Sequence, residues 1–194
     1  MTLSDENAFG VLIGYHALEH DEYALEPADF AARFVQFRAA VRECVAAFPL
    51  ADNVLVRELG HAVYLEFPDG DQKEDPIGWI KLVRARLTAL DLVSVGVLSH
   101  GGRWLTSSEA TDDTPPVVAG VEWSSVSLPS EPLRRALYAE TATHAADESE
   151  ANSEAAWGPG LYVDTEAIEA LGRALKNAPT PLAVAGATFF RVAR

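Results

Sequence analysis

Two histidines near the N-terminus have the spacing of a metal-binding pair. His16 and His20 are four residues apart and are followed by Asp21 and Glu22, so on a helix their imidazoles would share one face and could coordinate a divalent ion with a carboxylate. The residues before His16 favour a strand, which would direct the two rings apart, and Ala17 stands where a metalloprotease helix needs Glu. We therefore predict no metal site and expect these histidines to be exposed on an acidic loop.

Two further motifs resemble parts of nucleophilic or acyl-transfer sites, but neither forms a complete site. Ser99-His100-Gly101-Gly102 resembles the His-Gly-Gly oxyanion loop of esterases, but the chain has no Gly-x-Ser-x-Gly turn to carry a nucleophile. We interpret Gly101-Gly102 as a hairpin turn that returns through Arg103-Trp104-Leu105. Cys44, the only cysteine, falls on the apolar stripe of a predicted helix, where a buried thiol is inert.

Short acidic motifs do not complete a calcium or nucleotide site. Asp69-Gly70-Asp71 and the run from 147 to 154 both miss ligand positions of the EF-hand loop. Neither a phosphate-binding loop nor a dinucleotide fingerprint is present, so the sequence predicts no cofactor. Nucleic acid is excluded as a partner because the net charge is −14 and the few basic residues do not cluster.

The acidic residues are concentrated in two parts of the chain. The first 29 residues carry seven acidic side chains and no Lys or Arg, and residues 104 to 172 carry thirteen acidic side chains against two Arg. Dense carboxylates beside a Gly/Pro-framed Trp are typical of a surface that attracts a basic protein. The predicted partner-binding residues are Glu19, Asp21, Glu22, Asp147, Glu148, Glu150, Glu154, Trp157 and Tyr162. Two alternatives remain open. The acidic residues could serve solubility alone, and Trp157 could be folded over the edge of the core instead of binding a partner.

The elements that must position these residues follow the order β-α-β-β-α-β in the first half. We expect a strand over 8–15, a helix from Pro27 to Pro49 and two strands hinged on Gly60. A helix beginning at Pro76 and a strand over 92–98 follow. In the first helix, apolar residues recur at steps of four and three, leaving the charged side chains outside the stripe. This order is that of ferredoxin-like domains, which host many unrelated functions.

The second half predicts the order β-α-β-α-β. Strands are expected over 117–128, 160–163 and 182–192, with a helix over 131–144 capped by Ser130 and another capped by Asp164 or Thr165. We predict an α+β fold, with a ferredoxin-like half over 1–106, a linker over 107–116 and a second half over 117–194. Both halves are expected to share one mixed sheet and core, with about four helices on one face.

Composition indicates an ordinary globular protein. Hydrophobic residues make up 48% of the 194 residues and charged residues 23%, well within the range of chains that bury a core. The Arg-rich, Ala-rich usage is typical of a high-GC bacterium or archaeon. With one cysteine, no signal peptide pattern and no long apolar stretch, the sequence predicts a cytoplasmic protein without a membrane span.

Three functional hypotheses fit these observations. The leading one is a non-catalytic binding protein, most specifically an inhibitor or immunity protein that covers the cationic site of a toxin with carboxylates. The second is a small enzyme or ligand-sensing domain with a pocket between sheet and helices, using His61, His100 or Arg103 as polar groups. This second hypothesis predicts a convergent His and carboxylate of perturbed pKa. The third is a phage or assembly component whose acidity serves solubility.

Overall fold

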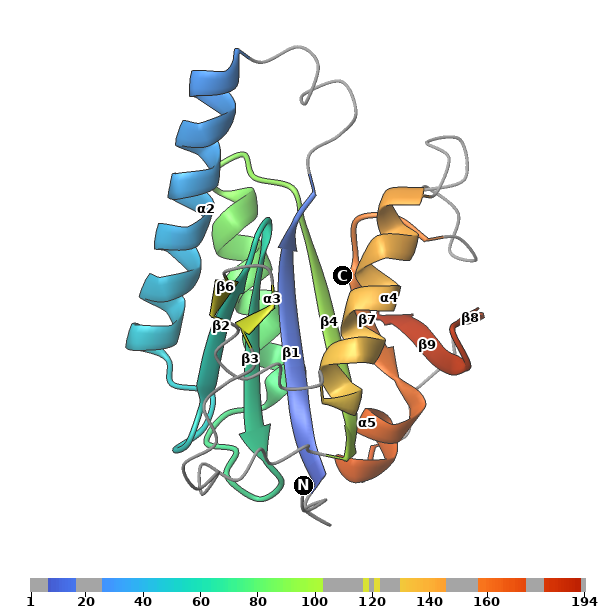
Figure 1. Ribbon diagram of the computed structural model, residues 1–194. Helices are drawn as coiled ribbons and strands as arrows, with labels where there is room; N and C mark the ends of the chain where they lie inside the picture. Colours follow the sequence, from blue (N-terminus) through green and yellow to red (C-terminus); the bar gives the residue numbers. More distant parts are fainter. Residues whose placement is uncertain are drawn as a thin grey trace.

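A seven-stranded mixed sheet forms the centre of the molecule (Figure 1). The computed structural model describes residues 7–16, 26–102, 117–118, 121–122, 130–145, 157–173 and 180–192. The strands lie in the order β2-β3-β1-β4-β7-β9-β8. Their bounds are β1 Asn7–Tyr15, β2 Leu55–Leu59, β3 Ala62–Pro68, β4 Ser94–Gly102, β7 Leu161–Asp164, β8 Pro181–Val184 and β9 Ala187–Val192. The helices are α2 Pro27–Ala47, α3 Pro76–Thr88, α4 Glu131–Ala145 and α5 Thr165–Ala170.

The first four strands have the ferredoxin-like arrangement that the sequence predicted. β1 is antiparallel to both β3 and β4, and β2 pairs with β3 at the edge of the sheet. The second part of the chain extends this sheet, since β7 runs parallel to β4 and the β8–β9 hairpin follows it. The α+β fold class is therefore confirmed, and strand order places β1 in the interior of the sheet.

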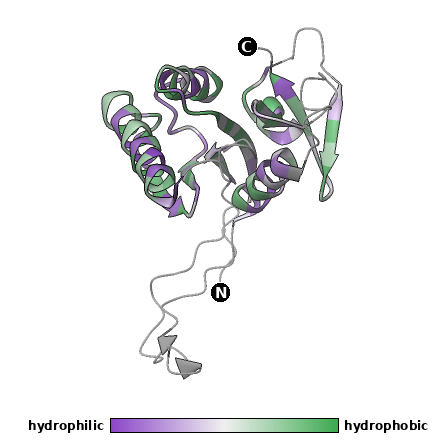
Figure 2. Ribbon diagram, turned by 90° about the horizontal axis from the view of Figure 1, so that it is seen from above, coloured by the Kyte–Doolittle hydropathy of each residue, from purple (hydrophilic) through white to green (hydrophobic). Residues whose placement is uncertain are grey.

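The helices cover both faces of the sheet, which corrects the expectation of helices on one face only. α2 and α3 lie over one face, where alternate β1 residues such as Val11 and Ile13 join a core with Phe37 and Ile80. α4 lies across the other face, above β1 and β4, where Leu12 packs in a second core. Figure 2 shows hydrophobic and hydrophilic residues alternating along the helices, as expected when only one side of each helix meets the sheet.

Glycines on one face of β1 allow α4 to come close to the strand. A Cβ atom on Gly10 would lie 2.7 Å from the Cβ of Pro132 and 2.5 Å from the hydroxyl of Tyr64. A Cβ on Gly14 would lie 3.2 Å from the Cγ and Oε1 atoms of Glu140. The glycine spacing in the strand thus sets the path of α4, and with it the position of the Glu140 carboxylate.

Three predicted elements differ from the structure. Gly101 and Gly102 are not a hairpin turn, because β4 continues through them and pairs them with the start of β1. The predicted strand over 182–192 is divided into β8 and β9 at Ala185 and Gly186, whose φ angles of 49° and 81° make a turn. In the predicted strand over 117–128, the described residues form two short paired strands, β5 (Val117–Val118) and β6 (Val121–Glu122).

No helix in the described ranges is both long enough and apolar enough to cross a bilayer. The predicted linker over 107–116 lies outside the described residues.

Candidate functional site

Three elements that are distant in the sequence meet at the carboxyl end of β1. His61 follows Gly60 in the turn between β2 and β3, and its carbonyl accepts a hydrogen bond of 2.9 Å from the backbone N–H of Tyr15. α4 crosses above this point and places Glu140 and His144 one turn apart on the same face. The positive φ of Gly60, 55°, allows the tight turn that carries His61 to this end of the sheet.

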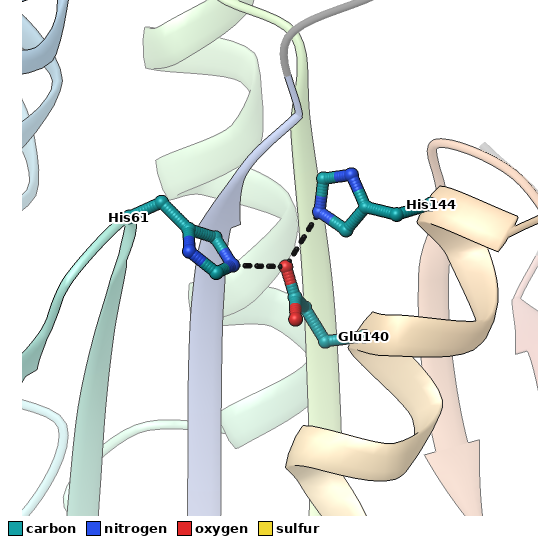
Figure 3. Close-up of side chains that lie close together, drawn as sticks. All are labelled: His61, Glu140 and His144. Carbon is teal, nitrogen blue, oxygen red and sulfur yellow. Dashed lines mark hydrogen bonds and ion pairs between the residues drawn. The ribbon is translucent and has the colours of Figure 1, made fainter.

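The side chains of these elements converge on a single oxygen atom (Figure 3). The Nε2 atoms of His61 and His144 each lie 2.7 Å from Oε1 of Glu140. The two imidazole rings stand nearly perpendicular, at 88°, with their centroids 5.5 Å apart. One donor atom from each of the three residues lies within 4.8 Å of the other two, a grouping compatible with a metal ion.

The carboxylate lies deeper in the molecule than the two rings that contact it. The side chain of Glu140 is 4% exposed, whereas those of His61 and His144 are 52% and 35% exposed. Burial alone would raise the pKa of Glu140, but hydrogen bonds and attraction from the two histidines lower this pKa to about 2. Glu140 is therefore an anion throughout the physiological pH range.

The hydrogen-bond roles follow from this charge. An ionised carboxylate only accepts, so each imidazole must donate the proton of its Nε2 atom to Oε1. These two protons occupy positions that a metal ion would take when it binds the same three atoms. Zn²⁺ held tetrahedrally at its usual bond lengths would separate the donor atoms by about 3.3 Å. The observed 2.7 Å contacts would have to widen by about half an ångström.

A second cluster of charged groups lies at the other end of α4. Arg135 contacts Oε1 of Glu131 at 2.5 Å, Oε2 of Glu166 at 2.8 Å and Oδ2 of Asp164 at 3.5 Å. Asp164 is completely buried and accepts hydrogen bonds from the backbone N–H groups of Ala167 and of a β4 residue. Burial raises the pKa of Asp164 to about 6, although these hydrogen bonds and Arg135 act in the opposite direction.

His100, which the second hypothesis named, belongs to a simpler pair. It is buried in β4, its ring lies 4.8 Å from that of Phe9, and its Nε2 atom is 2.9 Å from Oδ2 of Asp69. One carboxylate and one imidazole provide too few ligands for a protein metal site. Arg103, named with it, lies outside the described residues.

Most of the predicted partner-binding residues lie outside the described residues, namely Glu19, Asp21, Glu22, Asp147, Glu148, Glu150 and Glu154. Trp157 is half-buried, and its ring packs at 4.9 Å from that of Tyr162 and at 5.9 Å from that of Phe189. Tyr162 is completely buried, with its hydroxyl bonded to the backbone of Gly158, so its side chain has no surface to offer a partner.

The predictions about metal-binding and nucleophilic residues had mixed outcomes. His16 is 8% exposed and lies beside His144, so the expectation of an exposed histidine is wrong for it. His20 lies outside the described residues. Cys44 is buried as predicted, and burial raises the pKa of its thiol. An apolar hollow of about 370 Å³ beside Cys44 lies between α2 and α3, away from the histidines.

The cluster of His61, Glu140 and His144 was missed in the sequence. Two of its members were visible as a Glu and a His four residues apart in a predicted helix, a spacing that places both on one face. The third is 79 residues away from Glu140. Its contact depends on α4 crossing the sheet face opposite α2 and α3, which local patterns do not specify.

Comparisons with known proteins identify similar folds but no family. No known family matches the sequence, and no curated protein does. The solved structure of the guanylyl cyclase Cya2 is similar with a TM-score of 0.57 at 10% identity, over 98% of this chain and 94% of that one. The adenylyl cyclase CyaB from P. aeruginosa is similar with a TM-score of 0.58 at 9% identity, over 100% and 97% of the two chains. At these identities the likeness establishes the shared fold.

These findings correct the leading hypothesis from the sequence. An inhibitor or immunity protein is the wrong interpretation, because the solved structures that are similar over nearly the whole chain are cyclases. The charge pattern that suggested it falls largely on residues outside the described ranges. The hypothesis of an enzyme or ligand-sensing domain agrees better with the structure, since it predicted a convergent His and carboxylate with a perturbed pKa. His61 and Glu140 form such a pair.

Proposed function

We propose that this chain is a metal-binding domain that holds one divalent transition-metal ion between His61, Glu140 and His144. The observation that carries the proposal is the convergence of two imidazole Nε2 atoms on one buried carboxylate oxygen, each at 2.7 Å. Two histidines and one carboxylate are a common donor set for such ions in proteins. The ion would replace the two shared protons.

The donor set favours some metals over others. Imidazole nitrogen suits Zn²⁺, Cu²⁺, Ni²⁺ and Fe²⁺, whereas Mg²⁺ and Ca²⁺ prefer shells made wholly of oxygen. Two of the three donor atoms here are imidazole nitrogens. We therefore expect Zn²⁺ to bind far more tightly than Mg²⁺ or Ca²⁺.

The protonation state of the carboxylate also supports cation binding. With its pKa lowered to about 2, Glu140 does not need to lose a proton before it can coordinate an ion. Any proton released on binding therefore comes from the histidines.

Charge in the neighbouring sequence favours cations as well. The chain continues from His16 towards Glu19, Asp21 and Glu22, and from the end of α4 towards Asp147 and Glu148. The whole chain carries a net charge of −14. An acidic protein attracts cations and repels anions over roughly a Debye length, about 8 to 10 Å at physiological salt. The acidity that suggested a basic protein partner thus also suits a metal ion.

Isothermal titration of the whole chain with Zn²⁺, after removal of metals by a chelator, tests this function. We expect one ion per chain, and Glu140→Gln should weaken binding by at least about 100-fold, since it keeps the shape but removes the charged ligand. Asp69→Asn is the matched control, because it removes the carboxylate from the other His–carboxylate pair. Failure of the native chain to bind Zn²⁺, or equal binding by Glu140→Gln, would contradict the proposal.

A further inference from the structure

A third imidazole lies against the cluster. His16 directly follows β1, and its backbone N–H donates a hydrogen bond of 2.9 Å to the carbonyl of Val93, which fixes the end of the strand. Its ring stacks on the ring of His144, with the centroids 4.6 Å apart and the planes at 25°. Three histidines from three separate elements therefore surround Glu140.

The ring of His16 has a nitrogen whose hydrogen-bonding capacity is unused. Its Nδ1 atom is buried and has no hydrogen-bond partner among the described residues. A buried polar atom without a partner typically costs about 1–3 kcal/mol relative to one that is bonded. Buried polar groups normally have a hydrogen-bond partner, so we expect this nitrogen to bind a ligand.

The ring also has the chemistry of a metal ligand. A neutral imidazole carries a lone pair on one of its two nitrogens, and this lone pair is what binds a metal ion. His16 is more than nine-tenths buried beside the cluster, since the residue is only 8% exposed.

We propose that His16 is the fourth protein ligand of the metal ion, which completes a shell of three imidazoles and one carboxylate. The inference rests on the proposed function of the same site. In the stacked position the lone pair of His16 cannot point at an ion that lies in the plane of the His144 ring. Coordination therefore requires the His16 ring to turn about its side-chain torsions, from the face of His144 to its edge.

A fourth protein ligand would determine what the site does. Zinc sites with four protein ligands are structural, whereas catalytic sites keep one position for water or substrate. With His16 included, the ion would join the end of β1, the β2–β3 turn and the last turns of α4. The bound ion would then hold these elements together, as in a structural site, and would not activate a water molecule.

Cobalt provides a direct test, because four-coordinate tetrahedral Co²⁺ absorbs visible light much more strongly than five- or six-coordinate Co²⁺. The whole chain is titrated with Co²⁺ and its visible spectrum recorded for the native protein and for His16→Phe. Phenylalanine keeps a ring stacked on His144 but removes both nitrogens. Tyr15→Phe, at the neighbouring position on the other sheet face, is the matched control.

The native protein and Tyr15→Phe should show the intense tetrahedral bands. His16→Phe should bind at least about tenfold more weakly, and its bands should shift, because water would replace an imidazole as the fourth ligand. If His16→Phe matches the native affinity and spectrum, His16 only stacks on His144 and the inference is wrong. A native protein that binds no Co²⁺ would instead refute the proposed function. Should His16→Phe melt at a lower temperature without metal, His16→Ala provides a second variant, and native affinity with unshifted bands in that variant would equally overturn the inference.

Discussion

The two ends of α4 each meet a buried carboxylate, yet the two carboxylates are perturbed in opposite directions. Glu140, near the carboxyl end of the helix, has its pKa lowered to about 2, whereas the pKa of Asp164, near the amino end, is raised to about 6. Burial raises the pKa of both groups. The difference therefore comes from the groups that surround each carboxylate.

The partners differ in kind. Glu140 accepts hydrogen bonds from two imidazoles, whose protons can leave, and has no competing acid within its cluster. Asp164 accepts from fixed backbone N–H groups and shares one guanidinium with Glu131 and Glu166. Arg135 already occupies the position of a cation and cannot be deprotonated. At the amino end of α4, Arg135 thus already supplies the cation that the carboxylates need. At the carboxyl end, the imidazole protons can be displaced by a metal ion.

Removal of Arg135 should have the largest effect on stability, because it takes the cation from the amino end of α4. In Arg135→Met the carboxylates of Glu131, Asp164 and Glu166 lose their shared cation, and we expect the free energy of unfolding to fall by about 3 kcal/mol or more. Urea denaturation measures this change. Zn²⁺ affinity of the folded variant should stay native, because the metal cluster lies at the other end of the helix. A loss of less than about 0.5 kcal/mol would show that Arg135 is not the structural cation of this end.

The pH dependence of stability tests the perturbation of Asp164. Its pKa is raised from 3.8 to about 6 in the folded protein, so its contribution to stability is fully present below pH 4 and is lost as the pH rises through 6. We expect the stability difference between the native protein and Asp164→Asn to shift against the native protein by up to about 3 kcal/mol over this range. Denaturation curves at pH 4, 5, 6 and 7 measure it. A difference that stays constant with pH would refute the raised pKa.

The two glycines of β1 beneath α4 distinguish packing from metal binding. Gly10→Ala should destabilise the protein by about 1–3 kcal/mol, since the new methyl group meets the rigid ring of Pro132. Gly14→Ala meets only the flexible side chain of Glu140, so its cost should stay below about 1 kcal/mol, but its displacement of the carboxylate should weaken Zn²⁺ binding. Thermal melting and zinc titration of both variants check these outcomes. Equal zinc affinities would contradict the role of Gly14.

The smallest effect is expected for a carboxylate with solvent access. Glu58, at the edge strand β2, pairs with Arg38 and Arg42 and has a side chain that is 32% exposed. Glu58→Gln should change stability by less than about 1 kcal/mol, because solvent screens such pairs. A loss as large as that of Arg135→Met, measured by urea denaturation, would show that burial does not explain the contrast between these ion pairs.

The first half of the fold could be predicted from local chemistry. Pro27 and Pro76 mark the first residues of α2 and α3, because proline fixes φ and lacks the N–H that a helix start leaves unpaired. Gly60 marks the β2–β3 turn. In contrast, Gly101 and Gly102 carry a turn signal that long-range pairing with β1 overrides. Ala185 adopts a positive φ that no local propensity favours, so the division of the last strand was not visible.

The candidate site was harder to predict from the sequence than the fold. The Glu140 and His144 spacing could be seen, but the arrival of His61 depends on three-dimensional packing at the glycines of β1. His16 was noticed for its spacing to His20, whereas its ring lies against that of His144. Two residues on one helix can be predicted to lie side by side from the number of residues between them. Residues on separate strands are brought together by sheet order and helix path, which local patterns constrain weakly.

A crystal of the zinc-loaded protein, measured at wavelengths on either side of the zinc absorption edge, tests the central claim most directly. The anomalous signal locates the ion independently of its effect on stability. We expect one peak bonded to Nε2 of His61, Nε2 of His144 and Oε1 of Glu140 at about 2.0–2.2 Å. A peak at the Asp69–His100 pair in place of this position, or no peak at the three residues in zinc-saturated crystals, would contradict the assignment of this cluster as a metal site.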